Sequence, residues 1–580
     1  MTVNFGKIIV KFYVLIICFF YGSIFSGCVL GILGWYRPLG AILTTLGLTA
    51  SLYLVFLRNS LDSLVEDIFQ GENWGLPFKL DWVIYVGSIL LIGGMFLFPQ
   101  VFWPQTVAGN WFPWDAGVYH FPKAVELFRG GSINDMSISY SEYPVGYESL
   151  LALGLSMSRS DILFGSMHAL IHLFFILSLW LLAVRFSRIP PSILLFLTTM
   201  MVKSGSIVKG LNIWQVFRLE IITVGKNDLF VAAAILSMLL FFPLDGNGKP
   251  KSKYFFPFSL ASMLAISIKP NAIIVTVILW AAVVWSSIRQ IKKNEETGGP
   301  DLRKWPLNFL LIAPGGLWVV RNLIFQGAVF SSDVLMGTAS SILSNIRNPV
   351  FYSHIPGQLL LISGLVFAIT ILGFIKPKFF QWHAFFSVLL YLALLVTPHV
   401  IVFEYKETPV QFNPRFAEAL IAYLFVILLV LLELPIHQIL KWFYPNQFTR
   451  FLFLLCFVIT VSGTLFAFRG TLRLRPENDI IRRDQYREAV GVDGYYSVYD
   501  FVQKNVRDSV VWVENGLHYY VYGRDYSNSV SRKTKPDYIV VIKTDWFGLG
   551  GFDAPRYFPE NWRDIFEIVY EDSHGVVVKR

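Results

Sequence analysis

Apolar residues occur along this chain in long runs, without the short or alternating patterns of soluble proteins. A helix needs about 20 consecutive apolar residues to cross a bilayer, and roughly thirteen stretches approach that length. The pattern therefore predicts a polytopic α-helical membrane protein with about thirteen transmembrane helices. The predicted segments are 8–33, 38–57, 82–102, 161–185, 190–208, 228–244, 254–268, 271–289, 306–325, 357–375, 383–402, 416–434 and 450–469.

The pattern changes near residue 470, where charges become dense and Pro, Asp and Gly separate short apolar runs. Short apolar runs bounded by turn residues are typical of buried strands. We expect strands at 510–513, 538–542, 566–570 and 576–578, the last two forming a closing pair, and a helix at 497–504. The chain is thus divided into a transmembrane domain, 1–470, and a small extracytoplasmic α/β domain, 471–580.

The composition identifies lipid as the main solvent of this chain. Of its residues 55% are hydrophobic and only 15% are charged, whereas soluble domains carry about 25% charged residues. A water-soluble core could not hide this much apolar surface. The net charge of +9 would suggest nucleic acid in a soluble protein, but basic cytoplasmic loops account for it here. We expect membrane lipids as partners and no nucleic acid.

Lys and Arg are distributed unevenly among the loops. They gather before the first predicted span, after the fourth, sixth, eighth and tenth, and before the last, at Lys7, Lys11, Arg185, Arg188, Lys249, Lys251, Lys253, Arg289, Lys292, Lys293, Arg303, Lys304, Lys376, Lys378, Lys441 and Arg450. Cytoplasmic loops carry such an excess, so the N-terminus is predicted to be cytoplasmic. An odd number of spans then places the C-terminus outside. The acidic loop 58–81 falls inside and is interpreted as an interfacial helix.

Three predicted outside loops carry most of the polar residues, at 103–160, 203–227 and 403–415. The second contradicts the charge bias, with Lys203, Lys209, Arg218 and Lys226. A group of cations on this side predicts an anionic partner, either lipid head groups in general or a specific phosphate.

Asp115 is the candidate catalytic base. It lies between Trp114 and Tyr119 just beyond a predicted membrane exit, where aromatic neighbours lower the local dielectric and help a carboxylate to take up a proton. By itself the pattern favours a helix N-cap, because Asp often begins a helix.

A second carboxylate, Glu142, follows in the same loop before Tyr143 and Pro144. Paired acids divide acid and base roles or bind a divalent metal cation, so Asp115 and Glu142 are also candidate metal ligands. The alternative for Glu142 is a solvated loop charge.

Five cations are candidates for binding a donor phosphate. Lys226 begins a span after the basic loop, although snorkelling also explains it. Lys269 interrupts an apolar run, where an unpaired charge is costly. Arg415 is the strongest candidate, because a guanidinium binds two phosphate oxygens at once. The others are Arg321, at the outer border of a span, and His120, for which an ordinary hydrogen-bonding role is favoured.

The chain resembles the bacterial GT-C glycosyltransferases, polytopic enzymes that include protein O-mannosyltransferases and the lipid A aminoarabinose transferase. The resemblance rests on Asp115 followed by Tyr119-His120-Phe121-Pro122, on Glu142-Tyr143-Pro144, on Lys226-Asn227-Asp228 and Lys269-Pro270-Asn271 at span edges, and on Pro414-Arg415-Phe416 opening a late span. The architecture matches better than these short motifs. The chain departs from the family in having more than one span before the catalytic loop, and in lacking the second acid that some members carry beside the first.

This resemblance implies a GT-C-like fold in a bacterial inner or plasma membrane and a polyprenyl-phosphate sugar donor. Asp115, in the catalytic outer loop 103–160, would deprotonate a glycan, lipid or protein acceptor. The acceptor would attack the anomeric carbon with inversion, while Lys226 and Arg415 stabilise the departing phosphate.

Other functions remain open from the residues alone. A transporter or flippase of lipid-linked sugars would share the many spans and outer cations, but it usually has related halves, and no internal repeat is found. A polysaccharide polymerase or ligase would use a lipid-diphosphate donor. A membrane anchor for the tail domain is a further alternative.

Overall fold

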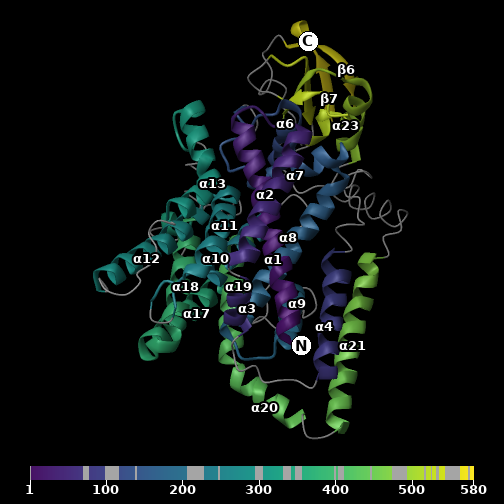
Figure 1. Cartoon of the computed structure of the whole chain (residues 1–580). Coiled ribbons are helices and arrows are strands. Elements are labelled where there is room, and N and C mark those ends of the chain that lie inside the picture. The colour runs from purple at the N-terminus through teal and green to yellow at the C-terminus, as the bar shows by residue number, and fades with distance from the viewer. Residues whose placement is uncertain are drawn as a thin grey trace.

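A computed structural model of the 580-residue chain shows a helical bundle with a small β-sheet at one end (Figure 1). The first helix begins near the opposite end of the bundle from the C-terminus. The structure describes residues 2–59, 61–69, 78–97, 116–136, 140–204, 227–245, 248–293, 305–330, 341–345, 356–397, 400–402, 411–443, 447–472, 493–514, 518–523, 525–530, 535–542, 562–572 and 575–580.

Among these residues, nine helices are long and apolar enough to cross a membrane. Two of them continue into π-helical turns, η1 (Ser26–Leu30) and η2 (Gly93–Leu97), and two begin with 3-10 turns, η4 (Asp161–Leu163) and η8 (Pro414–Ala417). The nine are α1 (Thr2–Phe25), α2 (Pro38–Asn59), α4 (Phe78–Ile92), α8 (Phe164–Phe186), α12 (Ala272–Lys293), α13 (Trp305–Gln326), α17 (Gly357–Ile375), α19 (Glu418–Leu431) and α21 (Gln447–Leu472).

Four further apolar helices are shorter, and they are α9 (Pro191–Ser204), α10 (Asp228–Leu240), α11 (Ser252–Ile268) and α18 (Pro377–Val396). Each of the predicted segments coincides with one of these helices, so the prediction of a polytopic helical membrane protein is confirmed. The count of about thirteen crossings stays a prediction, because a helix as short as α10 extends only about 20 Å, against a hydrocarbon core of about 30 Å.

The centre of the bundle is formed by α1, α8, α10 and α11, which pack against one another. Every residue of α10 is buried. The Tyr13 hydroxyl of α1 lies 2.9 Å from Ser178 Oγ of α8 and 2.7 Å from Ser237 Oγ of α10. Small hydroxyl residues allow membrane helices to approach closely, and their hydrogen bonds then join them.

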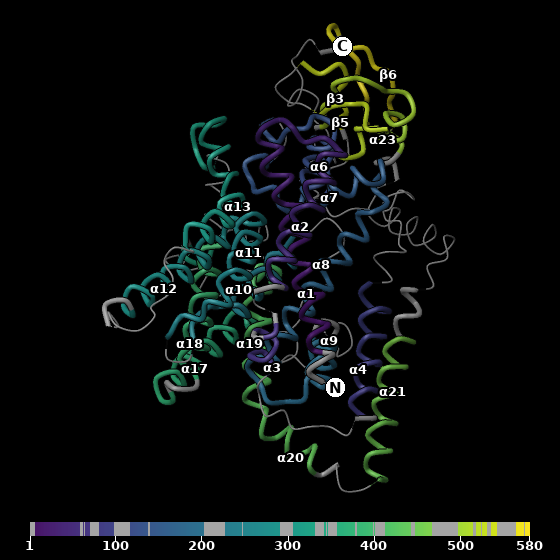
Figure 2. Tube along the Cα trace, viewed as in Figure 1, coloured from purple at the N-terminus to yellow at the C-terminus, as the bar shows by residue number. Residues whose placement is uncertain are grey.

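The outer helices expose large apolar side chains, as lipid contact requires. Trp285 of α12 is 72% exposed and Phe374 of α17 is 82% exposed. Helices α4 and α21 lie side by side at the edge of the bundle (Figure 2).

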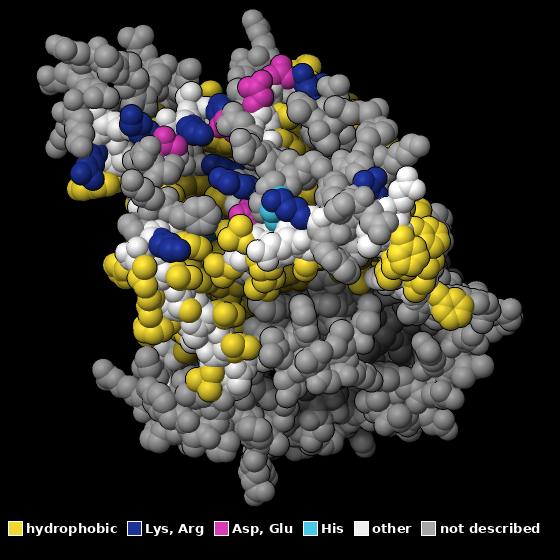
Figure 3. Space-filling view, turned by 90° about the horizontal axis from the view of Figure 1, so that it is seen from below, with side chains coloured by type: hydrophobic (Ala, Val, Ile, Leu, Met, Phe, Trp, Pro, Cys, Tyr) yellow, Lys and Arg dark blue, Asp and Glu magenta, His cyan; other side chains and the backbone are white. Residues whose placement is uncertain are grey.

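Within the acidic loop 58–81, the predicted helix is confirmed as α3 (Leu61–Phe69). Its apolar face is buried through Leu64 and Ile68. On its polar face, Asp67 Oδ2 lies 3.0 Å from Lys251 Nζ and 2.7 Å from Lys253 Nζ. Two of the cations that predicted the orientation therefore bind α3 to the start of α11. Figure 3 shows further Lys and Arg side chains across the face seen from this end.

The C-terminal residues form a five-stranded sheet in the order β4-β3-β5-β7-β6. Strand β3 is parallel to β4 and β5, and β7 is antiparallel to β5 and β6. The predicted strands, closing pair and helix are confirmed as β3 (Val510–Glu514), β5 (Tyr538–Ile542), β6 (Glu567–Glu571), β7 (Gly575–Lys579) and α23 (Asp493–Asn505), to which the structure adds β4 (Ser529–Val530).

The remaining described elements lie between these units or at their edges. They are η3 (Ala116–His120), α6 (Phe121–Gly130), α7 (Gly146–Ser158), α15 (Ile342–Asn345), the pair β1 (Ile401–Val402) and β2 (Gln411–Phe412), α20 (Glu433–Phe443), η9 (His518–Tyr522) and α25 (Trp562–Ile565).

Replacing Gly315 by Ala is expected to lower the thermal stability of the protein. A Cβ atom there would lie 2.5 Å from the Met263 carbonyl oxygen, so α13 would have to move away from α11, at a cost on the order of 1–3 kcal/mol. The neighbouring Gly316→Ala is the control, because a Cβ added at Gly316 meets nothing within 4 Å. Thermal unfolding in detergent, followed by tryptophan fluorescence, measures the difference. Equal melting temperatures for G315A and the wild type would contradict this helix contact.

Candidate functional site

Beneath the C-terminal sheet, two short helices cover one end of the bundle (Figure 1). The π-helical η3 runs directly into α6, and α6 packs against α7. Helix α6 is followed by Gly131, whose φ of 68° is the left-handed conformation that glycine adopts at helix ends. These helices lie in the predicted catalytic loop 103–160 and bring together residues from both of its halves.

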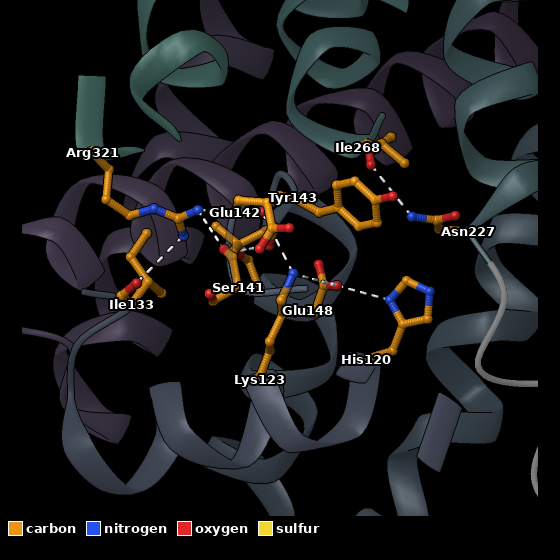
Figure 4. Close-up of polar contacts among 12 residues, drawn as sticks. His120, Lys123, Ile133, Ser141, Glu142, Tyr143, Glu148, Asn227, Ile268 and Arg321 are labelled. Atoms are coloured by element: carbon orange, nitrogen blue, oxygen red, sulfur yellow. Dashed lines mark hydrogen bonds and ion pairs between the residues drawn. The ribbon is translucent and has the colours of Figure 1, made fainter. Parts of the chain in front are cut away.

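A charged cluster is buried between α6 and α7 (Figure 4). His120 Nδ1 lies 2.8 Å from Glu148 Oε1, and both side chains are 2% exposed. Lys123 Nζ lies 3.9 Å from the same carboxylate oxygen and donates a 3.5 Å hydrogen bond to the Tyr143 carbonyl oxygen. Buried charges are costly unless they are paired, so this cluster needs all three members.

Burial and pairing act in opposite directions on the ionisation of this cluster. Burial lowers the pKa of Lys123 to about 8, although the Glu148 carboxylate acts against that shift. Burial would raise the pKa of Glu148, but Lys123 and the hydrogen bond from His120 outweigh it and hold the pKa below its usual value. At neutral pH Glu148 is therefore ionised and Lys123 is protonated.

Arg321 (Figure 4) and its neighbour Asn322, near the end of α13, hold the loop between α6 and α7. Arg321 is 1% exposed, and Nη2 donates a 2.6 Å hydrogen bond to the Ser141 carbonyl oxygen while Nη1 donates one of 3.3 Å to the carbonyl oxygen of Ile133. Asn322 Nδ2 donates a 2.7 Å hydrogen bond to the Glu142 carbonyl oxygen. The hydrogen bonds of Arg321 thus give it a structural role, and its binding of a phosphate stays a prediction.

A second polar group lies where α10, α12 and η8 begin and α11 ends. Lys269 forms an ion pair with Asp228 of α10. Its ammonium lies 4.8 Å from the ring centroid of Phe416, and the guanidinium of Arg415 lies at the same distance from that centroid. Asn227 Nδ2 donates a 3.3 Å hydrogen bond to the Ile268 carbonyl oxygen. Two predicted phosphate-binding cations, distant in the sequence, therefore lie beside one aromatic ring.

The two polar groups are neighbours because α7 begins with a glycine packed against the end of α11. A Cβ atom at Gly146 would lie 2.5 Å from the Ser267 carbonyl oxygen. Gly146 is two residues from Glu148, and Ser267 is two residues from Lys269. The approach of these two backbones places both polar groups at the same end of the bundle, and the two groups together are called the polar layer.

The C-terminal domain packs on this layer through η9. All five residues of η9 are buried. The Tyr519 hydroxyl donates a 2.7 Å hydrogen bond to Asp161 Oδ2, and the Tyr519 ring lies 5.1 Å from that of Phe121. Arg129 of α6 donates a 3.0 Å hydrogen bond to the Ser527 carbonyl oxygen. The domain thus fixes α6, which carries Lys123, from its outer side.

Burial also sets the charge state of this contact. It lowers the pKa of His518 to about 4 and raises the pKa of Tyr519 well above its usual value. Both side chains are therefore neutral at physiological pH, and the Tyr519 hydroxyl keeps the proton that it donates to Asp161.

The predicted site residues divide into four groups. His120 and Glu142 lie in the loop helices and turn described above, with Glu142 7% exposed, while Lys269 and Arg415 meet at Phe416. Arg321 lies behind the turn. Asp115 and Lys226 lie outside the described residues, so their roles stay predictions.

The predicted metal site at Asp115 and Glu142 also stays a prediction. Within the described part of the chain, no group of three His, Cys, Asp or Glu residues has the arrangement of a metal site. Asp115 lies outside that part.

Sequence reasoning missed the roles of Lys123, Glu148 and Asp228. His120 and Lys123 are three residues apart and so share one helix face, which was a usable signal. Nothing in the sequence indicates that this face meets Glu148.

Comparisons with known proteins add no family. No protein-family model matches the chain, and no curated protein or solved structure among those compared shows a significant match. The resemblance to GT-C glycosyltransferases therefore stays a prediction.

Replacing Glu148 by Gln is expected to destabilise the protein by about 3–5 kcal/mol, because it leaves Lys123 buried without a counter-charge. The control is Asp500→Asn, since Asp500 pairs with Lys504 at a distance of 3.8 Å with both side chains more than 60% exposed. Thermal unfolding in nanodiscs measures both changes. Adding Lys123→Met to Glu148→Gln is expected to recover part of the loss. A Glu148→Gln variant as stable as Asp500→Asn would show that the buried cluster contributes nothing.

Proposed function

We propose that this protein is a membrane glycosyltransferase that moves a sugar from a polyprenyl-phosphate donor to an acceptor on the extracytoplasmic side, with inversion at the anomeric carbon. The observation that carries the proposal is the polar layer in which the His120–Lys123–Glu148 cluster adjoins the Lys269–Asp228 pair and Arg415. Ionisable side chains buried within an apolar bundle are candidates for a functional site. Anionic, lipid-attached substrates suit such a site.

Asp115 is the proposed base. It directly precedes η3, the helix that delivers His120 to the buried cluster. Its carboxylate accepts the proton of an acceptor hydroxyl or amine, whose oxygen or nitrogen then forms a bond to the anomeric carbon. The bond from that carbon to the phosphate oxygen breaks, and its electron pair leaves with the polyprenyl phosphate. Correct placement of the two reactants supplies much of the rate enhancement in such a step.

The leaving phosphate gains negative charge as the bond breaks. Arg415, Lys269 and Lys226 are proposed to stabilise that charge. Asp228 holds Lys269 in place through their ion pair, and Lys269 and Arg415 both lie 4.8 Å from the ring centroid of Phe416. Arg415 is half-buried, a position that leaves part of its side chain accessible to a donor.

We infer that the site faces outward across a bacterial inner membrane and that the fold is GT-C-like. The Lys and Arg side chains seen among other residues at the N-terminal end of the bundle support a cytoplasmic N-terminus (Figure 3). The polar layer and the C-terminal domain lie at the opposite end (Figure 1). This arrangement favours an extracytoplasmic location for the reaction.

Mass spectrometry of lipid that co-purifies with the protein tests the donor class. A polyprenyl-phosphate sugar is the expected result. A polyprenyl-diphosphate glycan would favour a polymerase or ligase, and the absence of any polyprenyl lipid would count against the proposal.

Replacing Asp115 by Asn is expected to lower turnover by about 10²–10⁴-fold, because the amide cannot accept the acceptor's proton. The assay uses protein reconstituted in lipid with the co-purified donor, and nuclear magnetic resonance of the product identifies the anomer. Asp500→Asn, at an exposed position in α23, is the control. Full activity in Asp115→Asn, with normal elution and melting temperature, would exclude Asp115 as the base.

Replacing Arg415 by Ala is expected to raise the KM for the donor and to lower kcat, each by about tenfold or more, because a phosphate loses its two-point contact. Arg415→Lys keeps the charge and should lose less. Arg289→Ala, at an exposed position of α12, serves as the control. Unchanged KM and kcat in Arg415→Ala would remove Arg415 from the donor site.

A further inference from the structure

Three tyrosines form a compact group at the surface of the loop that carries the polar layer. The ring centroids of Tyr119 and Tyr140 lie 5.0 Å apart, and those of Tyr140 and Tyr143 lie 5.4 Å apart with an interplanar angle of 15°. Tyr140 is 43% exposed, whereas Tyr119 and Tyr143 are half-buried. One aromatic ring is thus presented outward on a support of two others.

The backbone beneath Tyr140 is held by hydrogen bonds from α13. The three carbonyl oxygens that follow Tyr140 in the chain, those of residues 141–143, all accept hydrogen bonds from Arg321 or Asn322. The Tyr143 amide also donates a 3.1 Å hydrogen bond to the Tyr140 carbonyl oxygen, which closes the turn. Burying the Arg321 guanidinium costs free energy of desolvation. Its hydrogen bonds hold a turn whose most exposed side chain is Tyr140.

Tyr140 also has a φ of 55°, in the left-handed region. That conformation costs a residue with a side chain about 1–2 kcal/mol. Glycine or asparagine would adopt it more easily, so a bulky exposed aromatic at this position is unfavourable for folding alone. Such strain gathers at ligand-binding positions.

Lys123 joins the aromatic group to the buried cluster. Its ammonium lies 5.7 Å from the ring centroid of Tyr119 and 5.8 Å from that of Tyr143. The same ammonium lies 3.9 Å from Glu148 Oε1. The tyrosines therefore rest on the polar layer.

We propose that Tyr140, supported by Tyr119 and Tyr143, is a stacking subsite for a pyranose or furanose ring of the donor or the acceptor. The face of an aromatic ring carries partial negative charge, and one face of a sugar ring carries several C–H groups with partial positive charge. The sugar stacks its C–H face on the ring, while its hydroxyls remain available to the polar groups nearby. This subsite deepens the proposed glycosyltransferase function and rests on it for its enzymatic consequence.

The binding test uses protein in nanodiscs without glycoside detergents, whose sugar head groups would compete. Saturation-transfer nuclear magnetic resonance is recorded with the methyl glycosides of glucose, galactose, mannose, N-acetylglucosamine and arabinose. We expect transfer to the ring protons of at least one glycoside. Tyr140→Phe should retain that binding, while Tyr140→Leu should weaken it by about three- to tenfold, because leucine keeps the bulk but has no aromatic face.

Trp35→Leu is the matched control, since Trp35 is a 66% exposed aromatic outside this loop, and it should leave binding unchanged. Tyr140→Leu should also have the melting temperature of the wild type. If the wild type showed saturation transfer to none of the glycosides, the subsite would be overturned. Equal saturation transfer in the wild type and Tyr140→Leu would also overturn the subsite. Tyr140 would then be a tyrosine of the membrane interface.

The enzymatic test separates donor from acceptor. In the reconstituted transfer assay, Tyr140→Leu should raise KM by about three- to tenfold for the substrate whose sugar it binds, with kcat little changed. A rise in the donor KM would show that Tyr140 binds the sugar of the donor. A rise in the acceptor KM would show that it binds a sugar of the acceptor. If Tyr140→Leu had the same donor KM and the same acceptor KM as the wild type, the subsite would be overturned.

The two proposals fail in different ways. Wild-type protein that binds a glycoside through Tyr140 but transfers no sugar would refute the transferase and leave the subsite. Active protein that shows neither glycoside binding nor a change in KM in Tyr140→Leu would refute the subsite alone.

Discussion

The ionised carboxylate of Glu148, enclosed within an apolar bundle, is the constraint on which this end of the molecule depends. A buried charge must be neutralised, and the two partners, His120 and Lys123, both come from η3 and α6. The carboxylate therefore fixes how α6 lies against α7. Because Gly146 packs two residues earlier against Ser267, the position of α7 in turn brings this cluster next to Lys269.

The same layer is held from two directions. From within the bundle, Arg321 and Asn322 bind the turn between α6 and α7. From outside, η9 of the C-terminal domain packs against α6, and the Tyr519 hydroxyl donates a hydrogen bond to Asp161. Such support keeps groups in fixed positions, which the proposed site for an anionic lipid-linked substrate needs. The C-terminal domain thus acts on the site by packing, whatever its further role.

At the other end, charge serves a different purpose. Asp67 of α3 binds Lys251 and Lys253 at the start of α11, and this joins an amphipathic helix to the bundle. The contrast between the ends is informative. The cations at the N-terminal end follow the charge bias of membrane proteins, whereas Lys269 and Arg415 lie at the opposite end around a shared aromatic ring.

The sequence by itself determined the class of protein, the position of each long apolar helix in the described part of the chain, the strands β3, β5, β6 and β7, and the helix within the acidic loop. These depend on hydrophobic runs and turn residues, which are local signals. It also indicated that charged residues at span ends matter. Only the tertiary structure decided which of them meet: Lys123 with Glu148, Lys269 with Asp228, and Arg321 with backbone carbonyls about 180 residues away. Such pairs follow from how helices pack, and no local pattern carries that information.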